Sequence, residues 1–174
     1  MNRNKKNEWF EWLQAIIIAL LIALSIKCFL FDIIEVEGNS MNPTLEDKDR
    51  LIVNKINYYF NQPEVGDIVI FEYPADRNFD FIKRIVAKEG DIVEIKNSTL
   101  YVNENKIIEP YIEAQRVEPF PRTVVPKDHF FVLGDNRRNS RDSRFSDVGF
   151  LKLGDIKGVA IYRIWPFRSL GSIK

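Results

Sequence analysis

The segment FIKRIVAKEGDIVEI, residues 81–95, contains two runs of β-branched and aromatic residues separated by a turn. Such residues favour strands, and Gly90-Asp91 between the runs is typical of a turn. Similar short runs, bounded by Gly, Pro, Asn or Asp, occur on both sides: residues 50–54, 67–73, 99–102, 129–133 and 156–165. The sequence therefore predicts a mainly β domain of antiparallel sheets.

The segments that connect these runs also predict local structure. Asn103-Glu104-Asn105 separates two strand-like runs and predicts a hairpin tip. Residues 109–126 contain four prolines, so we expect an extended loop there. No long amphipathic helix is expected after residue 31.

The N-terminal part of the chain has a different character. Residues 9–31 read WFEWLQAIIIALLIALSIKCFLF, and as a helix they span roughly 34 Å, enough for a hydrocarbon core. Trp9 and Trp12 stand at one end, where interface aromatics are found. The pattern predicts one transmembrane helix at residues 9–31, a lipid bilayer as partner, and a β-rich domain at residues 32–174.

Flanking charges indicate the orientation of this helix. Basic residues precede it and acidic residues follow it: Arg3, Lys5 and Lys6, then Asp32, Glu35 and Glu37. An excess of Lys and Arg marks the cytoplasmic side, so residues 1–8 are expected in the cytoplasm and residues 32–174 outside it. The alternative is a cleaved secretory signal with Ala23-Leu24-Ser25 as its small-x-small site. Apolar residues continue past Ser25 through Phe31, which favours a retained anchor.

Composition excludes several classes of function. The 25 basic and 25 acidic residues give a net charge of zero, and no basic stripe indicates nucleic-acid binding. The chain has one cysteine, Cys28, and one histidine, His129. An internal disulfide is therefore impossible, and neither a metal site nor a cofactor is expected.

Lys83 is the first candidate for chemistry. On a strand it shares one face with Phe81, Ile85 and Ala87, while Arg84 points to the other face. Burial among apolar neighbours disfavours the charged form and lowers a lysine pKa by up to ~3–5 units, which suits a general base. The alternative is a half-exposed strand whose Lys and Arg reach into solvent.

Two turn-rich segments supply further candidates. Ser40 lies in GNSMNPTL, residues 38–45, at the expected exit of a strand; the alternative there is a surface turn or helix cap. The segment GDNRRNSRDSR, residues 134–144, predicts a loop held by Asp–Arg pairs, in which Ser140 and Ser143 can orient another group.

Several catalytic mechanisms can be compared with the residues that the chain contains. A Ser-His-Asp triad would need His129, which begins an apolar run, and the chain has no G-x-S-x-G motif. Paired carboxylates for glycoside cleavage stay open, although nothing selects a pair. A serine nucleophile with a desolvated lysine base, one of the Ser-Lys variants of nucleophilic catalysis, remains.

The ordered set of GNSMNPTL, FIKRIVAKEGD and GDNRRNSRDSR behind an N-terminal anchor resembles the type I signal peptidases, specifically the short, single-anchor bacterial form. The resemblance covers nearly the whole chain. It implies a membrane-bound serine endopeptidase of mainly β fold, with Ser40 as nucleophile and Lys83 as general base. It also implies removal of signal peptides from exported preproteins after small-x-small sites, commonly Ala-x-Ala.

The same resemblance assigns supporting roles. Met41 would follow the nucleophile in the site, Ser140 would hydrogen-bond Lys83, and Asp142 and Arg144 would hold the surrounding loop. Pockets for small side chains would be lined by Ile34, Val36, Leu45 and Ile82.

One position departs from the family pattern. Gly38 stands where some members carry a serine whose hydroxyl helps bind the oxyanion. The Ser40 N–H remains as one donor, and a group of Gly38 or Asn39, or a water, would supply the second.

Two other hypotheses remain. The self-cleaving Ser/Lys repressor proteases share a related dyad, but they carry an N-terminal DNA-binding region where this chain has an apolar segment. A non-catalytic, membrane-anchored β module that binds exported chains is the alternative from another class. The intact candidate residues argue against it.

Overall fold

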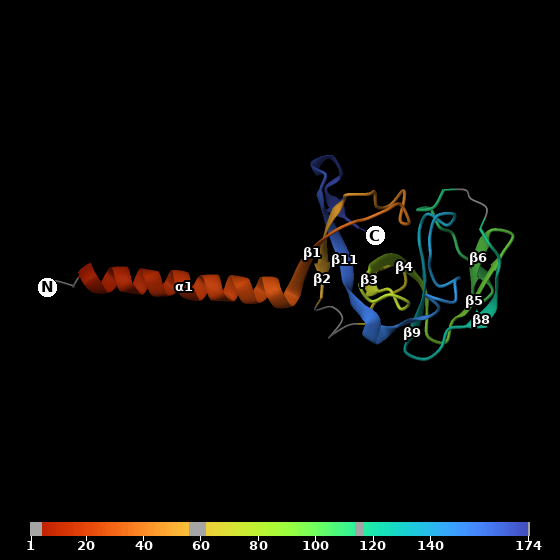
Figure 1. The fold of residues 1–174 in the computed structure, drawn as a ribbon, viewed down its shortest axis with the longest axis horizontal. Coiled ribbons are helices and arrows are strands. Elements are labelled where there is room, and N and C mark those ends of the chain that lie inside the picture. The colour runs from red at the N-terminus through yellow and green to blue at the C-terminus, as the bar shows by residue number, and fades with distance from the viewer. Residues whose placement is uncertain (1–4, 56–61, 114–116, 174) are drawn as a thin grey trace.

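The computed structural model describes residues 5–55, 62–113 and 117–173. A long helix, α1 (Lys5–Leu30), projects from a β-rich body that contains the rest of the described chain (Figure 1). The helix begins four residues before the predicted span, and Phe31 already pairs with Asn54 as the first residue of a strand. Arg3, and the side chains of Lys5, Lys6 and Cys28, lie outside the described residues.

Helix α1 carries no stripe of polar residues along its described side chains, and Trp9 and Trp12 are exposed. Among the residues that are described, no helix combines the length and the apolar character that a membrane span requires.

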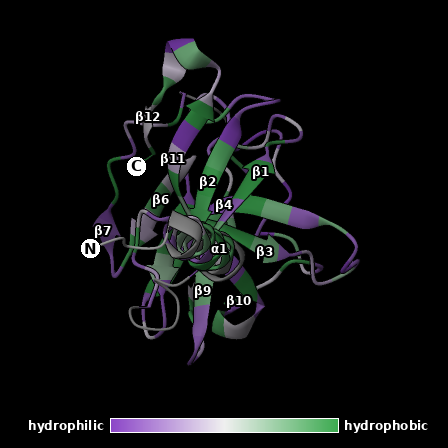
Figure 2. Cartoon of the chain, turned by 90° about the vertical axis from the view of Figure 1, so that its left-hand side faces the viewer, coloured by the Kyte–Doolittle hydropathy of each residue, from purple (hydrophilic) through white to green (hydrophobic). Residues whose placement is uncertain are grey.

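The body consists of two antiparallel sheets, which confirms the mainly β fold. The larger sheet has the order β1-β2-β11-β3-β4-β9-β10, with β12 paired to β11. Its strands are β1 (Phe31–Glu35), β2 (Arg50–Asn54), β3 (Ile68–Glu72), β4 (Asp80–Lys88), β9 (His129–Leu133), β10 (Leu151–Lys152), β11 (Ile156–Trp165) and β12 (Gly171–Ser172). Figure 2 looks along α1 and shows β2 and β3 coloured as hydrophobic over much of their length.

The smaller sheet has the order β7-β6-β5-β8. Its strands are β5 (Ile92–Lys96), β6 (Thr99–Val102), β7 (Asn105–Lys106) and β8 (Phe120–Val124). Two short 3-10 helices, η1 (Leu153–Asp155) and η2 (Phe167–Ser169), flank β11. The predicted hairpin tip is confirmed: Val102 pairs with Asn105, and both Asn103 and Glu104 have positive φ, as the favoured two-residue hairpin turn requires.

Strand β8 corrects one expectation, because it forms inside the segment predicted as a loop. It pairs with β5 at the edge of the smaller sheet. An edge strand tolerates proline, since one row of its backbone groups needs no partner. The register also shifts between Val93 and Ile95, opposite the stretch that contains Pro121. The four prolines thus limit this segment to an edge but do not exclude a strand.

Strand β4 lies at the centre of the packing. Ile82 packs against one hydrophobic cluster, Ile85 belongs to a second, and Val86 and Ala87 belong to a third. Residues from Lys83 to Ala87 are all buried, so the half-exposed alternative for this strand is wrong. Because Ile82 and Ile85 point to opposite faces and each packs in a cluster, the strand is covered on both faces.

Candidate active site

Ser40 and Lys83 meet in the structure. Ser40 lies in the turn after β1, and Lys83 comes from the middle of β4. Their Oγ and Nζ atoms are 2.8 Å apart and joined by a hydrogen bond. The second hydrogen bond of Nζ goes to the carbonyl oxygen of Ile82, at 2.9 Å. The two residues are 43 positions apart, so the fold brings them together.

The surroundings of Lys83 favour its neutral form. The residue is 3% exposed, so its amine is largely removed from water. Burial lowers the pKa of Lys83 to about 8, although the carboxylates of Asp142 and Asp135 act in the opposite direction. A substantial fraction of this amine is therefore neutral at mildly alkaline pH, and only a neutral amine can accept a proton.

Ser140 has a different partner from the one that the resemblance implies. Its hydroxyl donates to Asp142 Oδ2 at 2.7 Å. Among the described residues, the hydrogen bonds of Lys83 Nζ go to Ser40 and Ile82, and none joins it to Ser140.

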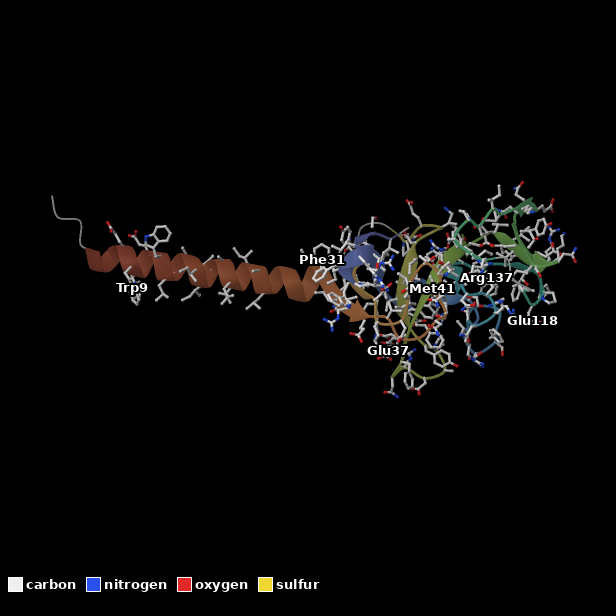
Figure 3. All side chains as sticks on the ribbon, turned by 90° about the horizontal axis from the view of Figure 1, so that it is seen from above. Trp9, Phe31, Glu37, Met41, Glu118 and Arg137 are labelled. Carbon is white, nitrogen blue, oxygen red and sulfur yellow. The ribbon has the colours of Figure 1, made fainter. Side chains whose placement is uncertain are left out.

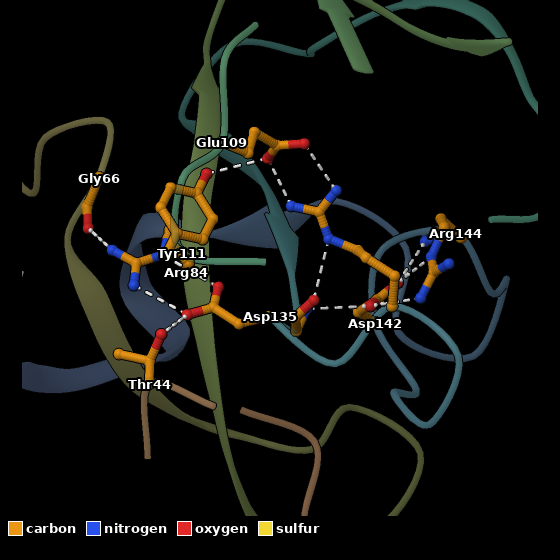
Figure 4. Close-up of polar contacts among 10 residues, drawn as sticks. Thr44, Gly66, Arg84, Glu109, Tyr111, Asp135, Asp142 and Arg144 are labelled. Carbon is orange, nitrogen blue, oxygen red and sulfur yellow. Dashed lines mark hydrogen bonds and ion pairs between the residues drawn. The ribbon is translucent and has the colours of Figure 1, made fainter. Parts of the chain in front are cut away.

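Asp142 and Arg144 hold the loop of residues 134–144. Arg144 donates from Nε and Nη2 to the two carboxylate oxygens of Asp142, at 2.7 and 2.8 Å. Asp142 also accepts from the Gly134 N–H at 3.0 Å. The pair is drawn on one side of Figure 4. A two-bond pair of this kind is geometrically specific, so it stiffens the segment that carries Ser140.

A second buried pair was missed from the sequence. Arg84 donates to Asp135 through Nε (3.0 Å) and Nη2 (2.8 Å), and through Nη1 to the carbonyl oxygen of Gly66 (2.8 Å) (Figure 4). The arginine does not reach into solvent, so that alternative is wrong for Arg84. Nothing in the sequence distinguished this buried arginine from one that reaches into solvent.

A third pair connects the loop after β7 to the same region. Arg137 binds Glu109 through Nη1 and Nη2, at 2.9 and 2.5 Å, and the tyrosine hydroxyl of Tyr111 donates to the same carboxylate. The Arg84 guanidinium lies 4.0 Å from the centroid of the Tyr111 ring, so the two buried arginine pairs are adjacent. Sequence reasoning expected Asp–Arg pairs within residues 134–144 and did not find this one.

A groove of about 680 Å³ leads to Ser40 and Lys83. Ser40, Met41 and Lys83 line it, together with three of the four expected pocket residues: Ile34, Val36 and Ile82. Leu45 is instead fully buried in the adjacent core and is not among the described residues that line the groove.

Gly38 has a positive φ of 86°, a conformation that glycine adopts without strain. Its N–H donates to Asp47 Oδ1 at 2.7 Å. The Gly38 N–H is therefore already engaged, which leaves Asn39 or a water to accompany the Ser40 N–H as a second oxyanion donor.

Comparison with known proteins indicates the family to which the chain belongs. The family model described as "Signal peptidase, peptidase S26" matches residues 9–165. A signal peptidase I of Bacillus amyloliquefaciens is 41% identical, and the match covers 99% of this chain and 93% of the relative. Signal peptidase I T of Bacillus subtilis (strain 168) is 39% identical, with the same coverage of both chains. A solved signal peptidase I from Enterococcus faecalis V583 is 30% identical; the match has a TM-score of 0.49 and covers 57% of this chain and 97% of that one.

The family match extends from within α1 to the end of β11, most of the chain, so the chain belongs to the signal peptidase family, peptidase S26. Within that family, the full-length similarity to the Bacillus enzymes places it among the bacterial type I signal peptidases.

Proposed function

We propose that this chain is a membrane-bound serine endopeptidase that removes N-terminal signal peptides from exported preproteins. Ser40 is the nucleophile and Lys83 the general base. The observation that carries the proposal is the 2.8 Å contact between Ser40 Oγ and a buried lysine Nζ whose pKa is lowered to about 8. A serine hydroxyl is a weak nucleophile until a base in hydrogen-bond reach accepts its proton.

The reaction proceeds in two halves. Neutral Lys83 takes the Ser40 proton while Oγ attacks the carbonyl carbon of the scissile bond, and Lys83 then protonates the leaving amine. A water that loses its proton to Lys83 attacks the resulting ester, and the proton returns to Ser40 as the carboxylate product leaves. The Ser40 N–H stabilises the oxyanion, with a group of Asn39 or a water as second donor.

Open backbone edges support binding of the substrate as an extended strand. Strand β1 ends the order of the larger sheet. Along β4, strand β9 pairs with Arg84–Lys88 and not with Asp80–Lys83, which leaves the latter with an edge free of β9. An extended peptide can add to such edges through main-chain hydrogen bonds. Ile34, Val36 and Ile82 line the groove there, and branched side chains at its walls favour small substrate residues at a small-x-small site.

Helix α1 supplies the proposed membrane anchor. Large apolar side chains cover its described surface, and Trp9 is 69% exposed, far from the body (Figure 3). Apolar surface of this extent favours a lipid environment. We place residues 1–8 in the cytoplasm, residues 9–31 in the bilayer and residues 32–174 outside the cytoplasm, following the charge bias. Ser40 follows Phe31 by nine residues, so it lies within roughly 30 Å of the helix end, where a signal-peptide cleavage site emerges.

The test uses the full chain in detergent and a synthetic peptide with one Ala-x-Ala site. The chain should cut after the second alanine, whereas Ser40→Ala should give no product even at one enzyme per peptide. Ser172→Ala is the matched control, because Ser172 is an exposed serine at the end of β12 and should retain full activity. Absence of product from the unmodified chain in a single turnover would overturn the proposal and favour a binding module.

A further inference from the structure

The segment Gly134–Asn136 lies between the turn that carries Ser40 and the strand that carries Lys83. Asn136 binds the nucleophile turn at two points. Its N–H donates to the Ser40 carbonyl oxygen at 3.0 Å, and its side-chain Nδ2 donates to the Asn39 carbonyl oxygen, also at 3.0 Å. The two carbonyls that flank the Ser40 amide nitrogen are thus held by a single residue.

Thr44 makes a third connection from the same turn. Its hydroxyl donates to Asp135 Oδ2, and Figure 4 shows this contact beside the Arg84 guanidinium. Asp135 is fully buried and receives two further hydrogen bonds from Arg84, the residue that follows Lys83. A short path therefore runs from the Ser40 turn through Thr44, Asp135 and Arg84 to the lysine strand.

Close packing prevents the segment from shifting. A Cβ atom on Gly134 would lie 2.5 Å from the Ser40 carbonyl oxygen and 2.2 Å from Ser140 Oγ. The backbone of Gly134 thus fills the space between the nucleophile turn and the loop of residues 134–144. No room is left for a side chain at Gly134, and a closely packed interior of this kind transmits displacements between its neighbours.

We propose that Thr44 and Asn136 are positioning residues that hold Ser40 Oγ within hydrogen-bond distance of Lys83 Nζ. The inference rests on the proposed function and extends it from the reacting pair to the contacts that set their separation. Ser40 belongs to a turn rather than to a strand, so no ladder of backbone hydrogen bonds fixes its position. A displacement of about 1 Å breaks a hydrogen bond of this length and can lower a rate about 100-fold.

The effect of the Thr44 hydroxyl on the rate can be measured separately from any effect on the stability of the fold. Asp135 keeps both hydrogen bonds from Arg84 when Thr44 is changed, so its charge stays paired. Valine has the size and branching of threonine without the donor, whereas serine keeps the donor and loses the methyl group. The pair Thr44→Val and Thr44→Ser therefore distinguishes the hydrogen bond from packing.

The experiment measures kcat and KM of the full chain in detergent on the Ala-x-Ala peptide, together with thermal unfolding. Thr44→Val should lower kcat about 10- to 100-fold with KM within about twofold of the unmodified chain, because the substrate groove is unchanged. Thr44→Ser should keep kcat within a few-fold of the unmodified chain. Asn136→Asp, which replaces the side-chain donor with an acceptor at equal size, should lower kcat in the same way.

The outcomes separate this inference from the proposed function. The positioning role alone is overturned if the unmodified chain is active and Thr44→Val keeps its full kcat. It is also overturned if Thr44→Val and Thr44→Ser lower kcat equally. An inactive unmodified chain would overturn the proposed function as well. If Thr44→Val fails to fold, the Asn136→Asp variant tests the positioning role instead. An unchanged kcat in Asn136→Asp overturns that role, and a fall in kcat at constant KM supports it.

Discussion

Arg84 and Asp135 form a two-bond ion pair in the interior of the domain, with side chains only 2% and 0% exposed. The pair joins β4 to the loop of residues 134–144 immediately beside Lys83. Burial of two charges is unfavourable unless their geometry and remaining hydrogen bonds compensate, and here Gly66 and Thr44 supply those bonds. Lys83 is therefore next to a residue whose own position is tightly specified.

Removal of one member of this pair should destabilise the fold strongly. Arg84→Met leaves Asp135 buried without its cation and is expected to lower the free energy of unfolding by about 3–5 kcal/mol. Urea unfolding followed by fluorescence measures the change. Arg122→Met is the control, because Arg122 forms an exposed pair with Glu104 and should change stability by no more than about 1 kcal/mol. Equal effects of the two substitutions would contradict the account.

Replacement of Lys83 should stabilise the protein while abolishing cleavage. The pKa of Lys83 falls from its ordinary 10.5 to about 8 on folding, so the unfolded chain binds more protons between these values. Stability therefore rises with pH across this window and is lost as pH falls through about 8. Lys83→Met removes the group and should be more stable than the unmodified chain at neutral pH, by an amount on the order of 1–3 kcal/mol.

The check on this prediction is denaturant unfolding at a pH near 7 and again near 10. The difference between Lys83→Met and the unmodified chain should shrink at the higher pH. Lys96→Met, at an exposed lysine of the smaller sheet, should show no such dependence. A Lys83→Met variant that is less stable at both pH values would refute the stated burial cost.

Gly134 should tolerate no side chain. A methyl group there collides with the Ser40 carbonyl oxygen and with Ser140, so Gly134→Ala is expected to cost about 1–3 kcal/mol and to lower the cleavage rate about 100-fold. Gly154→Ala is the matched control, since a Cβ at Gly154 meets nothing within 4 Å. Indistinguishable rates and melting temperatures for the two variants would show that the contact is not restrictive.

The groove wall should determine which residues fit before the cut. Ile34→Ala enlarges the groove and is expected to raise the kcat/KM ratio of a Val-x-Val peptide to an Ala-x-Ala peptide about 10-fold or more. Ile33→Ala serves as control, because Ile33 is the preceding residue of β1, is exposed and lines a different cavity. Peptide cleavage followed by mass spectrometry gives both ratios. A ratio that Ile34→Ala leaves unchanged would remove Ile34 from the specificity pocket.

Particular residues show which features of the structure could be predicted from the sequence. The strands near residues 81–95 were predictable because apolar runs and Gly-Asp turns are local signals. Ser40 and Lys83 were singled out by the order of three motifs, and the fold brings their side chains within hydrogen-bond distance. The partner of Arg84 was not, since a buried and a solvent-reaching arginine look alike in sequence and Asp135 lies 51 residues away. Strand β8 was missed because its edge position, which makes its proline tolerable, is a property of the assembled sheet.

The side-chain partners within the loop of residues 134–144 could not be predicted from the local sequence either. Ser140 has Asp142 two residues away and donates to it, although the family resemblance implied Lys83 as the partner. Glu109 and Arg137 belong to segments that meet only when the smaller sheet packs beside β9. Opposite charges in a sequence predict that pairs will form, but the fold decides which ones.

The pH dependence of kcat/KM tests the dyad most directly. With the Ala-x-Ala peptide and the full chain in detergent, the rate should rise about tenfold per pH unit at acidic and neutral pH, as Lys83 loses its proton. It should level off above an apparent pKa of about 8. A flat profile between about pH 5 and pH 9, or a Lys83→Met variant that retains the rate and profile of the unmodified chain, would contradict the account.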